Sequence, residues 1–168
     1  PVDYLSCNQP SGAPASQFRV VPQPTLAWGF DGTTTEYMSG LTPTSINGTV
    51  SYQTGKYGQG YYMNGPTSNI IYFGNFPTIP VNPGFSISFW WKPIDNTSGG
   101  VLLDMSSNYQ GGNYADRLLF YGRLNGIQFD FAGSFGWTSP VLTNGTWYHF
   151  TYVVLTTTAM IYMNGQLQ

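Results

Sequence analysis

The chain has 168 residues, enough for one domain with a short appendage. Charged residues make up only 7%, but 41% of residues are hydrophobic and 17% aromatic, so we expect a folded chain rather than a disordered one. The net charge is −2 and the five Lys and Arg residues are scattered, which argues against nucleic-acid binding. No long apolar run occurs, so no membrane span is expected.

Residues 1–24 contain five prolines among Ser, Ala and Gln. Proline fixes φ and removes a backbone donor, so this stretch is predicted to be an extended arm or linker. The only cysteine, Cys7, lies in it and cannot form an intrachain disulfide. It is either an unpaired residue without a role or a link to a second chain.

From Thr25 onward, short runs of aromatic and β-branched residues alternate with Gly, Asn and Pro, a pattern typical of strands and turns. No segment has the apolar stripe of an amphipathic helix. Many short strands indicate a β-sandwich or barrel. The predicted strands are Thr25–Phe30, Tyr61–Met63, Asn69–Phe73, Phe85–Lys92, Gly100–Met105, Arg117–Tyr121, Gly126–Phe131, Thr146–Leu155 and Ala159–Met163.

Asn-Gly pairs adopt positive φ at low cost, as tight turns require. They predict turns at Asn47-Gly48, Asn64-Gly65, Asn125-Gly126, Asn144-Gly145 and Asn164-Gly165.

Five motifs follow one another along the chain: Leu26–Gly32, Gly55–Gly65, Phe85–Pro93, Gly145–Phe150 and Ile161–Leu167. In this order they resemble the laminin-G-like and pentraxin-like domains of the concanavalin-A-like superfamily. The resemblance covers residues 25–168 and implies an all-β fold, a jelly roll of two antiparallel sheets packed face to face. It also implies ligand sites on rim loops or on a concave sheet.

The sequence departs from this family pattern at its end. Further strands normally follow the turn at Asn164-Gly165, but only Gln166–Gln168 remain. An unpaired edge beside Ala159–Met163 would expose backbone donors and promote association. We therefore expect either a fragment lacking its last strands or a neighbouring chain that completes the sheet.

Glycoside hydrolysis needs two carboxyl groups flanking the bond. The only glutamate, Glu36, lies in a Thr-rich segment, and Asp104, Asp116 and Asp130 belong to or adjoin separate strands. The single histidine, His149, is predicted to be a structural residue that is hydrogen-bonded on a strand face. The sequence therefore favours a protein without catalytic residues.

Clustered Cys and His ligands for a transition metal are absent from the sequence. Calcium takes oxygen ligands, and the family resemblance suggests Asp31 and Asp104, helped by Asn64 and Asn108. Seven acidic residues give little charge to hold a divalent ion, and these side chains could equally be turn formers. No cofactor is expected, with calcium as the alternative.

Alternation along Phe85–Lys92 places Trp90 opposite the apolar face, beside Ser and Lys side chains. An aromatic ring next to polar donors suits a sugar, whose C–H face stacks while its hydroxyls form hydrogen bonds. The alternative is that a loop or the second layer covers Trp90. Four further aromatic residues, predicted to lie in loops, complete the candidate binding surface: Tyr109, Tyr114, Phe135 and Trp137.

Three Asn-X-Ser/Thr sequons, at Asn47, Asn96 and Asn144, would accept glycans if the chain passes a glycosylating compartment. Turn geometry explains two of them equally well, since Asn47 and Asn144 each precede glycine.

The leading hypothesis is a non-catalytic recognition or adhesion module that binds a glycan or a protein, outside a cell or on a virion. The first alternative is a purely structural capsid, fibre or sheath subunit. The second alternative is a degenerate glycosidase.

Overall fold

The computed structural model describes residues 24–63, 69–74, 84–94, 100–105, 118–123, 126–131, 135–155 and 158–168. Every regular element in these ranges is a β-strand, which confirms the all-β prediction, and no helix there could span a membrane. The predicted arm and Cys7 lie outside the described residues, except for Pro24. The strands are β1 (Ser45–Asn47), β2 (Tyr52–Thr54), β3 (Gln59–Tyr61), β4 (Ile70–Tyr72), β5 (Gly84–Trp91), β6 (Gly100–Met105), β7 (Leu118–Arg123), β8 (Gly126–Phe131), β9 (Phe135–Thr138), β10 (Tyr148–Leu155), β11 (Ala159–Met163) and β12 (Gln166–Leu167).

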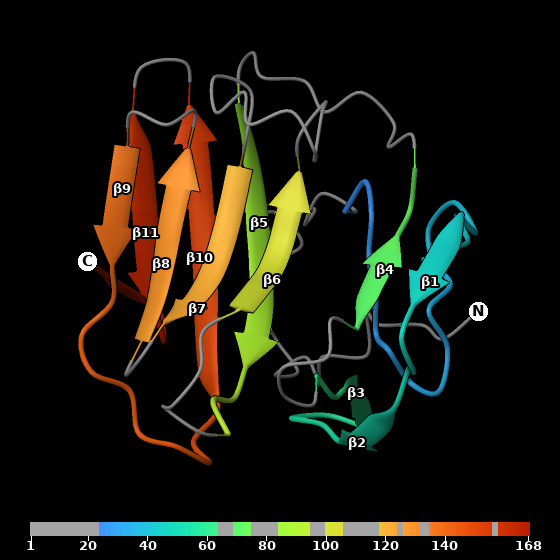
Figure 1. The fold of residues 1–168 in the computed structure, drawn as a ribbon. Coiled ribbons are helices and arrows are strands. Elements are labelled where there is room, and N and C mark those ends of the chain that lie inside the picture. The colour runs from blue at the N-terminus through green and yellow to red at the C-terminus, as the bar shows by residue number, and fades with distance from the viewer. Residues whose placement is uncertain are drawn as a thin grey trace, which may run out of the picture.

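Two four-stranded sheets form the body of the molecule. One has the strand order β12-β11-β10-β5 and the other β6-β7-β8-β9, and all neighbouring strands are antiparallel. Figure 1 shows the second sheet in front of the first, so the two form stacked layers. The predicted two-sheet antiparallel sandwich is confirmed.

Two small sheets lie beside the sandwich. β1 pairs with β4, and β2 pairs with β3 in a hairpin. Figure 1 shows them to the right of and below the large sheets. β1 and β2 were not predicted, because each has only three residues and lacks a run of apolar or aromatic residues.

The core follows from alternation along the strands. In β10, Phe150, Tyr152 and Val154 are buried, whereas the residues between them are more exposed. Successive strand residues point to opposite faces, so one face of the sheet is apolar and the other is not. The buried core residues are Leu118, Phe120, Ile127, Phe129, Leu142, Phe150, Tyr152, Val154 and Ile161.

Aromatic contacts join the two sheets. Phe89 of β5 meets Phe120 of β7 edge-on, with ring centroids 4.9 Å apart. Tyr152 of β10 contacts Phe129 of β8 at 3.6 Å and Phe120 at 6.0 Å. Such pairs add about 0.5–1.5 kcal/mol each to the free energy gained by burying the rings.

The predicted first strand, Thr25–Phe30, is wrong because this segment is irregular. Phe30 has a φ of 57°, in the left-handed region, and its carbonyl accepts a hydrogen bond from the Gly32 N–H. Trp28 packs edge-on against Phe73, with centroids 5.0 Å apart. The apolar side chains of this segment therefore pack without a β-ladder, which propensity alone does not distinguish from a strand.

A buried carboxylate organises the segment before β1. Glu36 is fully buried, and its carboxylate accepts hydrogen bonds from the backbone N–H groups of Ala27, Met38 and Ser39 and from the Ser39 hydroxyl. Burial raises the pKa of this carboxyl group, but the four hydrogen bonds outweigh burial and lower the pKa to about 2. Glu36 therefore fixes the loop as an ionised group.

The edge beside Ala159–Met163 differs in part from the prediction. Asn164 and Gly165 have φ values of 51° and 78° and form the predicted tight turn. The two-residue strand β12 then pairs with Tyr162 and Met163 of β11, and the Gln168 N–H donates to the Ile161 carbonyl. Among the described residues, the first residues of β11 pair with β10 on one side and with no strand on the other side.

Candidate functional site

The face of the β5–β10 pair that points away from the core is the candidate site. Its residues lie opposite one another in three rows of the ladder: Trp90 with His149, Ser88 with Thr151, and Ser86 with Val153. The intervening residues of both strands pack into or against the core. We refer to Trp90, Ser88, His149 and Thr151 as the Trp90 face.

Trp90 is 37% exposed, and ring or cation contacts with His149, Tyr57 and Lys56 are recorded for it among the described residues. The His149 ring lies against it at 4.8 Å, and Tyr57 approaches edge-on at 6.0 Å. The Lys56 Nζ atom lies over the indole, 4.9 Å from its centroid. The predicted outward placement is confirmed, and so, in part, is the alternative that a loop covers the ring.

A chain of polar groups continues from the indole along the face. Ser88 Oγ lies 2.8 Å from His149 Nε2 and 3.2 Å from Thr151 Oγ1. His149 is therefore hydrogen-bonded on a strand face, as predicted. A ring beside hydroxyl and imidazole groups offers stacking and directional hydrogen bonding at one place.

The loop that supplies Lys56 and Tyr57 joins β2 to β3. The Gly55 N–H donates to the Gly58 carbonyl at 2.9 Å, which closes the loop. Gly58 has a φ of 58°, and a Cβ there would collide with Asp31 Oδ1 at 2.2 Å. Asp31 Oδ1 accepts from the Gln59 N–H at 2.6 Å, so this carboxylate fastens the loop.

The β2–β3 hairpin also reaches the end of the face beyond Trp90. A Cβ added at Gly60 would lie 3.9 Å from the Trp147 ring. Lys92 Nζ lies 5.1 Å from the centroid of that same ring. Two lysine–tryptophan contacts therefore lie where the hairpin meets the sheet.

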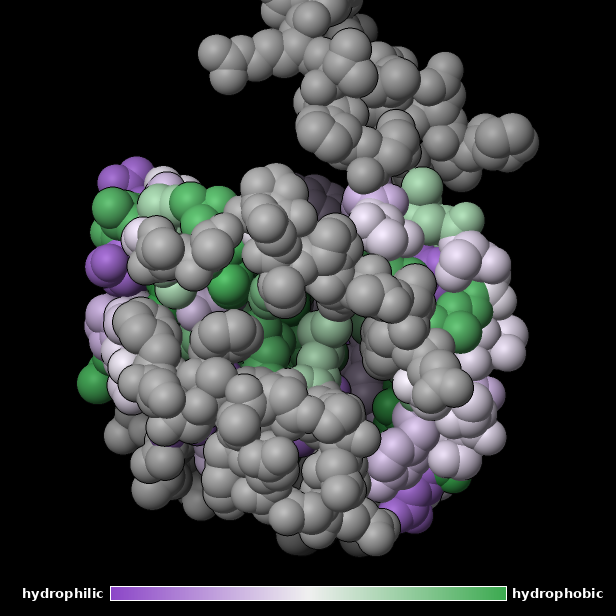
Figure 2. Space-filling view, turned by 90° about the horizontal axis from the view of Figure 1, so that it is seen from above, coloured by the Kyte–Doolittle hydropathy of each residue, from purple (hydrophilic) through white to green (hydrophobic). Residues whose placement is uncertain are grey.

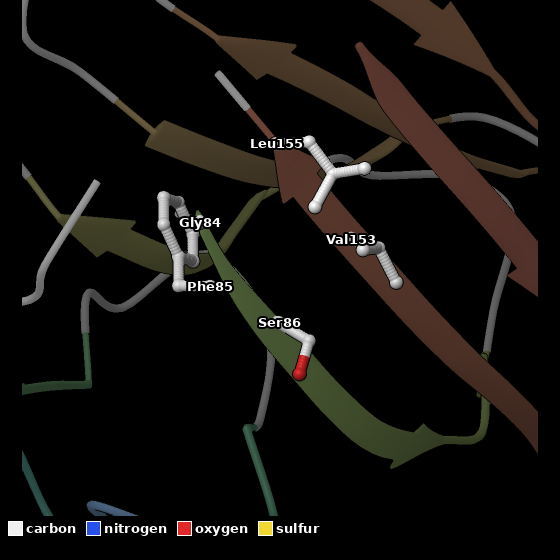
Figure 3. Close-up of a pocket in the computed structure, with 5 residues that line it drawn as sticks. All are labelled: Gly84, Phe85, Ser86, Val153 and Leu155. Atoms are coloured by element: carbon white, nitrogen blue, oxygen red, sulfur yellow. The ribbon is translucent and has the colours of Figure 1, made fainter. Parts of the chain in front are cut away.

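At the other end of these two strands lies a shallow, mainly apolar depression of about 240 Å³. Figure 3 shows Ser86 on β5 and Val153 and Leu155 on β10, with Gly84 and Phe85 at the start of β5. It continues the outward face beyond Ser88 and Thr151. The face thus changes from aromatic and polar to apolar along its length.

The other predicted binding residues are placed differently. Tyr109 and Tyr114 lie outside the described residues. Phe135 and Trp137 were expected in a loop, but both belong to β9. The Trp137 side chain packs against the core, which accounts for this aromatic residue without a ligand. The short strand was missed because glycine and serine surround its aromatic residues.

The two proposed calcium ligands lie in different elements. Asp31 is in the turn that holds the β2–β3 loop, and Asp104 is half-buried in β6 opposite Leu119. Asn64 and Asn108 lie outside the described residues. In the part of the chain that is described, no group of three or more His, Cys, Asp or Glu side chains could hold a metal ion. Calcium binding stays a prediction.

Two of the three sequon asparagines are described. Asn47 ends β1 and Asn144 lies in a turn, and both are exposed. Asn96 lies outside the described residues. Glycosylation stays a prediction.

The Ser88–His149 pair has the spacing of a nucleophile and its base. A triad also needs a carboxylate on the imidazole and donors for an oxyanion. The interactions recorded for the imidazole of His149 among the described residues are the hydrogen bond with Ser88 and the contact with the Trp90 ring.

Sequence reasoning did not find Lys56 and Tyr57, which lie about 30 residues before Trp90. Glycines flank both residues, a composition that signals a tight loop but not what the loop touches.

A laminin G family model, described as the concanavalin A-like lectin/glucanases superfamily, matches residues 64–168. No curated protein and no solved structure matches the chain significantly. The matched residues include all strands of the two large sheets, whereas β1, β2 and β3 precede them. The match covers more than half of the chain, and the all-β, antiparallel architecture is consistent with it. The chain therefore belongs to the concanavalin A-like lectin/glucanases superfamily.

Proposed function

We propose that this protein is a non-catalytic recognition module that binds a glycan on its Trp90 face, displayed outside a cell or on a virion. Laminin-G-like domains are generally non-catalytic binding modules for carbohydrates or proteins, although the superfamily includes glycosidases. This family background sets the class of function, and the face itself suggests the ligand.

The observation that carries the proposal is the partly exposed indole of Trp90 beside a line of hydroxyl groups. A pyranose ring presents C–H groups on one face and hydroxyls around its edge, so it can stack on an indole while Ser88 and Thr151 accept or donate hydrogen bonds. The site is held by strands rather than loops, which limits the entropy lost on binding.

The same face supports the non-catalytic part of the proposal. The outward residues of β5, β10 and β11 in its rows include no Asp or Glu. A pair of carboxyl groups flanking a sugar bond would be required for the usual glycosidase mechanisms. Incubation with polysaccharides should therefore release no reducing sugar.

A glycan array followed by calorimetry tests the proposal, with and without a calcium chelator. Trp90→Ala should weaken binding about tenfold or more, and Ser88→Ala several-fold, since both remove contacts to the sugar. Ser86→Ala is the matched control, because Ser86 is on the same strand and face but outside the hydrogen-bonded line. Absence of binding to every glycan, or full binding by Trp90→Ala, would refute the proposal.

One observation favours a second function, the assembly of copies into a larger structure. β9 (Phe135–Thr138) is the last strand of its sheet, and no described strand pairs with its outer edge. Open edges pair with other strands. Light scattering after gel filtration distinguishes the cases: oligomers at micromolar concentration favour assembly, and a clean monomer argues against it.

A further inference from the structure

The charged group recorded on the Trp90 ring is a cation, and none of the four described carboxylates is recorded in contact with the Trp90 face. Among the described acidic residues, Glu36 is buried in its own loop and Asp31 is bonded to the Gln59 N–H. Asp104 and Asp130 belong to the other sheet. Lys56 is the charged residue whose contact with Trp90 the structure records.

The Lys56 ammonium is exposed and forms no ion pair with any described residue. Its recorded partner is the π face of Trp90, 4.9 Å away. A sugar ring that stacks on this face of the indole must therefore displace the Lys56 ammonium. An exposed cation–π contact is worth about 0.5–1 kcal/mol, which corresponds to a factor of roughly two to five in affinity.

A neutral sugar would offer the displaced ammonium only uncharged hydroxyl oxygens as acceptors. A sugar that carries a carboxylate or a sulfate would give it a charge-assisted hydrogen bond beside the same ring. Lys56 stands on a short loop closed by the Gly55–Gly58 hydrogen bond and fastened by Asp31, so the displaced amino group stays close to the ring edge.

We infer that the Trp90 face selects acidic saccharides, with Lys56 as the residue that determines this specificity. The inference rests on the proposed function and names its substrate class. It also assigns a role to the β2–β3 hairpin, which precedes the residues matched by the family model.

Calorimetry with matched pairs of sugars tests this inference at low ionic strength. The probes are 3′-sialyllactose against lactose, and 6-sulfo-galactose against galactose, so that the two pairs separate a carboxylate from a sulfate. We expect the acidic member of at least one pair to bind about fivefold more tightly, with the preference falling as salt rises.

Lys56→Ala should remove this preference and, by uncovering the indole, leave neutral binding unchanged or up to about fivefold tighter. Lys56→Arg should keep the preference. The matched control is Lys92→Ala, which removes the same charge and the same kind of contact, but from Trp147. Thermal melting confirms that each variant is folded.

Equal binding of neutral and acidic sugars to the wild type would overturn the inference. So would an equal loss of preference in Lys56→Ala and Lys92→Ala, since net charge would then suffice. If binding requires Trp90 but shows no preference, only the acidic specificity fails. If no glycan on the array binds, or if Trp90→Ala binds as tightly as the wild type, the proposed function fails with it.

Discussion

Two regions of this molecule are held together by different interactions. Among the residues that the structure describes, the nine buried core residues lie between Leu118 and Ile161, and none comes from residues 24–63. The fully buried side chain of the earlier segment is the carboxylate of Glu36. In Figure 2 the right side, where β1 and β4 lie, is mostly pale or polar, whereas hydrophobic residues show near the middle. The sandwich is held by a buried apolar core, whereas the earlier segment combines aromatic contacts such as Trp28–Phe73 with the hydrogen bonds of a buried carboxylate.

The candidate site lies where these regions meet. The sandwich supplies Trp90, Ser88 and His149 on rigid strands, and the earlier segment supplies Lys56 and Tyr57 on a loop. Trp90 therefore belongs to the residues that the family model matches, whereas Lys56 comes from a segment that precedes them. Specificity can then change without any change in the core.

The largest effect on the free energy of unfolding is expected from a substitution on the buried face of β10, compared with one on its open face. Phe150→Ala should lower the free energy of unfolding by about 3–5 kcal/mol, because it opens a cavity beside Phe89 and Trp91. Thr151→Ala, one residue later on the open face, should cost less than about 1 kcal/mol. Urea denaturation measures both. Equal losses would show that both faces of β10 are packed alike.

The second largest effect on the free energy of unfolding is expected at the buried carboxylate of Glu36, in the segment before β1. Glu36→Gln should lower the free energy of unfolding by about 2–3 kcal/mol, because an amide cannot accept all four hydrogen bonds. The folded-state pKa lies below the usual 4.5, so the stabilisation by Glu36 is present above about pH 4.5 and is lost as the pH falls toward about 2.

Hydrogen exchange above and below this pH range, corrected for intrinsic rates, separates the regions. The amides of Ala27, Met38 and Ser39 should lose protection in acid before those of β10. Glu36→Gln should lack this acid step, whereas Asp130→Asn, on the other sheet, should keep it. If acid lowers the protection of the amides equally in both regions, Glu36 does not stabilise its segment separately from the sandwich.

The smallest effect tests a polar atom inside the apolar region. The Tyr152 hydroxyl is buried without a hydrogen-bond partner among the described residues, and burial raises its pKa. Tyr152→Phe should therefore change the free energy of unfolding by less than about 0.5 kcal/mol, or stabilise the fold. Tyr148→Phe is the control, because its hydroxyl accepts from the Thr143 N–H, and it should cost about 1 kcal/mol. A larger loss for Tyr152→Phe would indicate a partner for this hydroxyl.

Much of the sandwich could be predicted from the sequence. Residues Phe85–Phe89 alternate between apolar side chains and serine, which indicates the face that is buried, and the aromatic and β-branched residues of Thr146–Leu155 indicate a strand. The turn at Asn164-Gly165 was also predictable, because a tight hairpin turn needs positive φ at two positions and Asn and Gly adopt it at low cost. The placement of Trp90 and the hydrogen bonding of His149 followed from the same pattern.

The earlier segment was much less predictable. Leu26–Phe30 has the composition of a strand, but its side chains pack without a β-ladder, and nothing local reveals that Glu36 accepts a hydrogen bond from Ala27, nine residues away. Lys56 reaches Trp90 only through the tertiary fold. Interactions that join distant segments leave no period in the sequence, so a pattern search cannot find them.

The most direct test of the central claim is a nitrogen–proton NMR titration with the best-binding glycan, after the tryptophan indole signals have been assigned by single substitutions. We predict that the Trp90 indole and the His149 signals shift progressively, while the indole of Trp137, packed against the core, stays unchanged. Shifts at Trp137 with none at Trp90 would contradict the account.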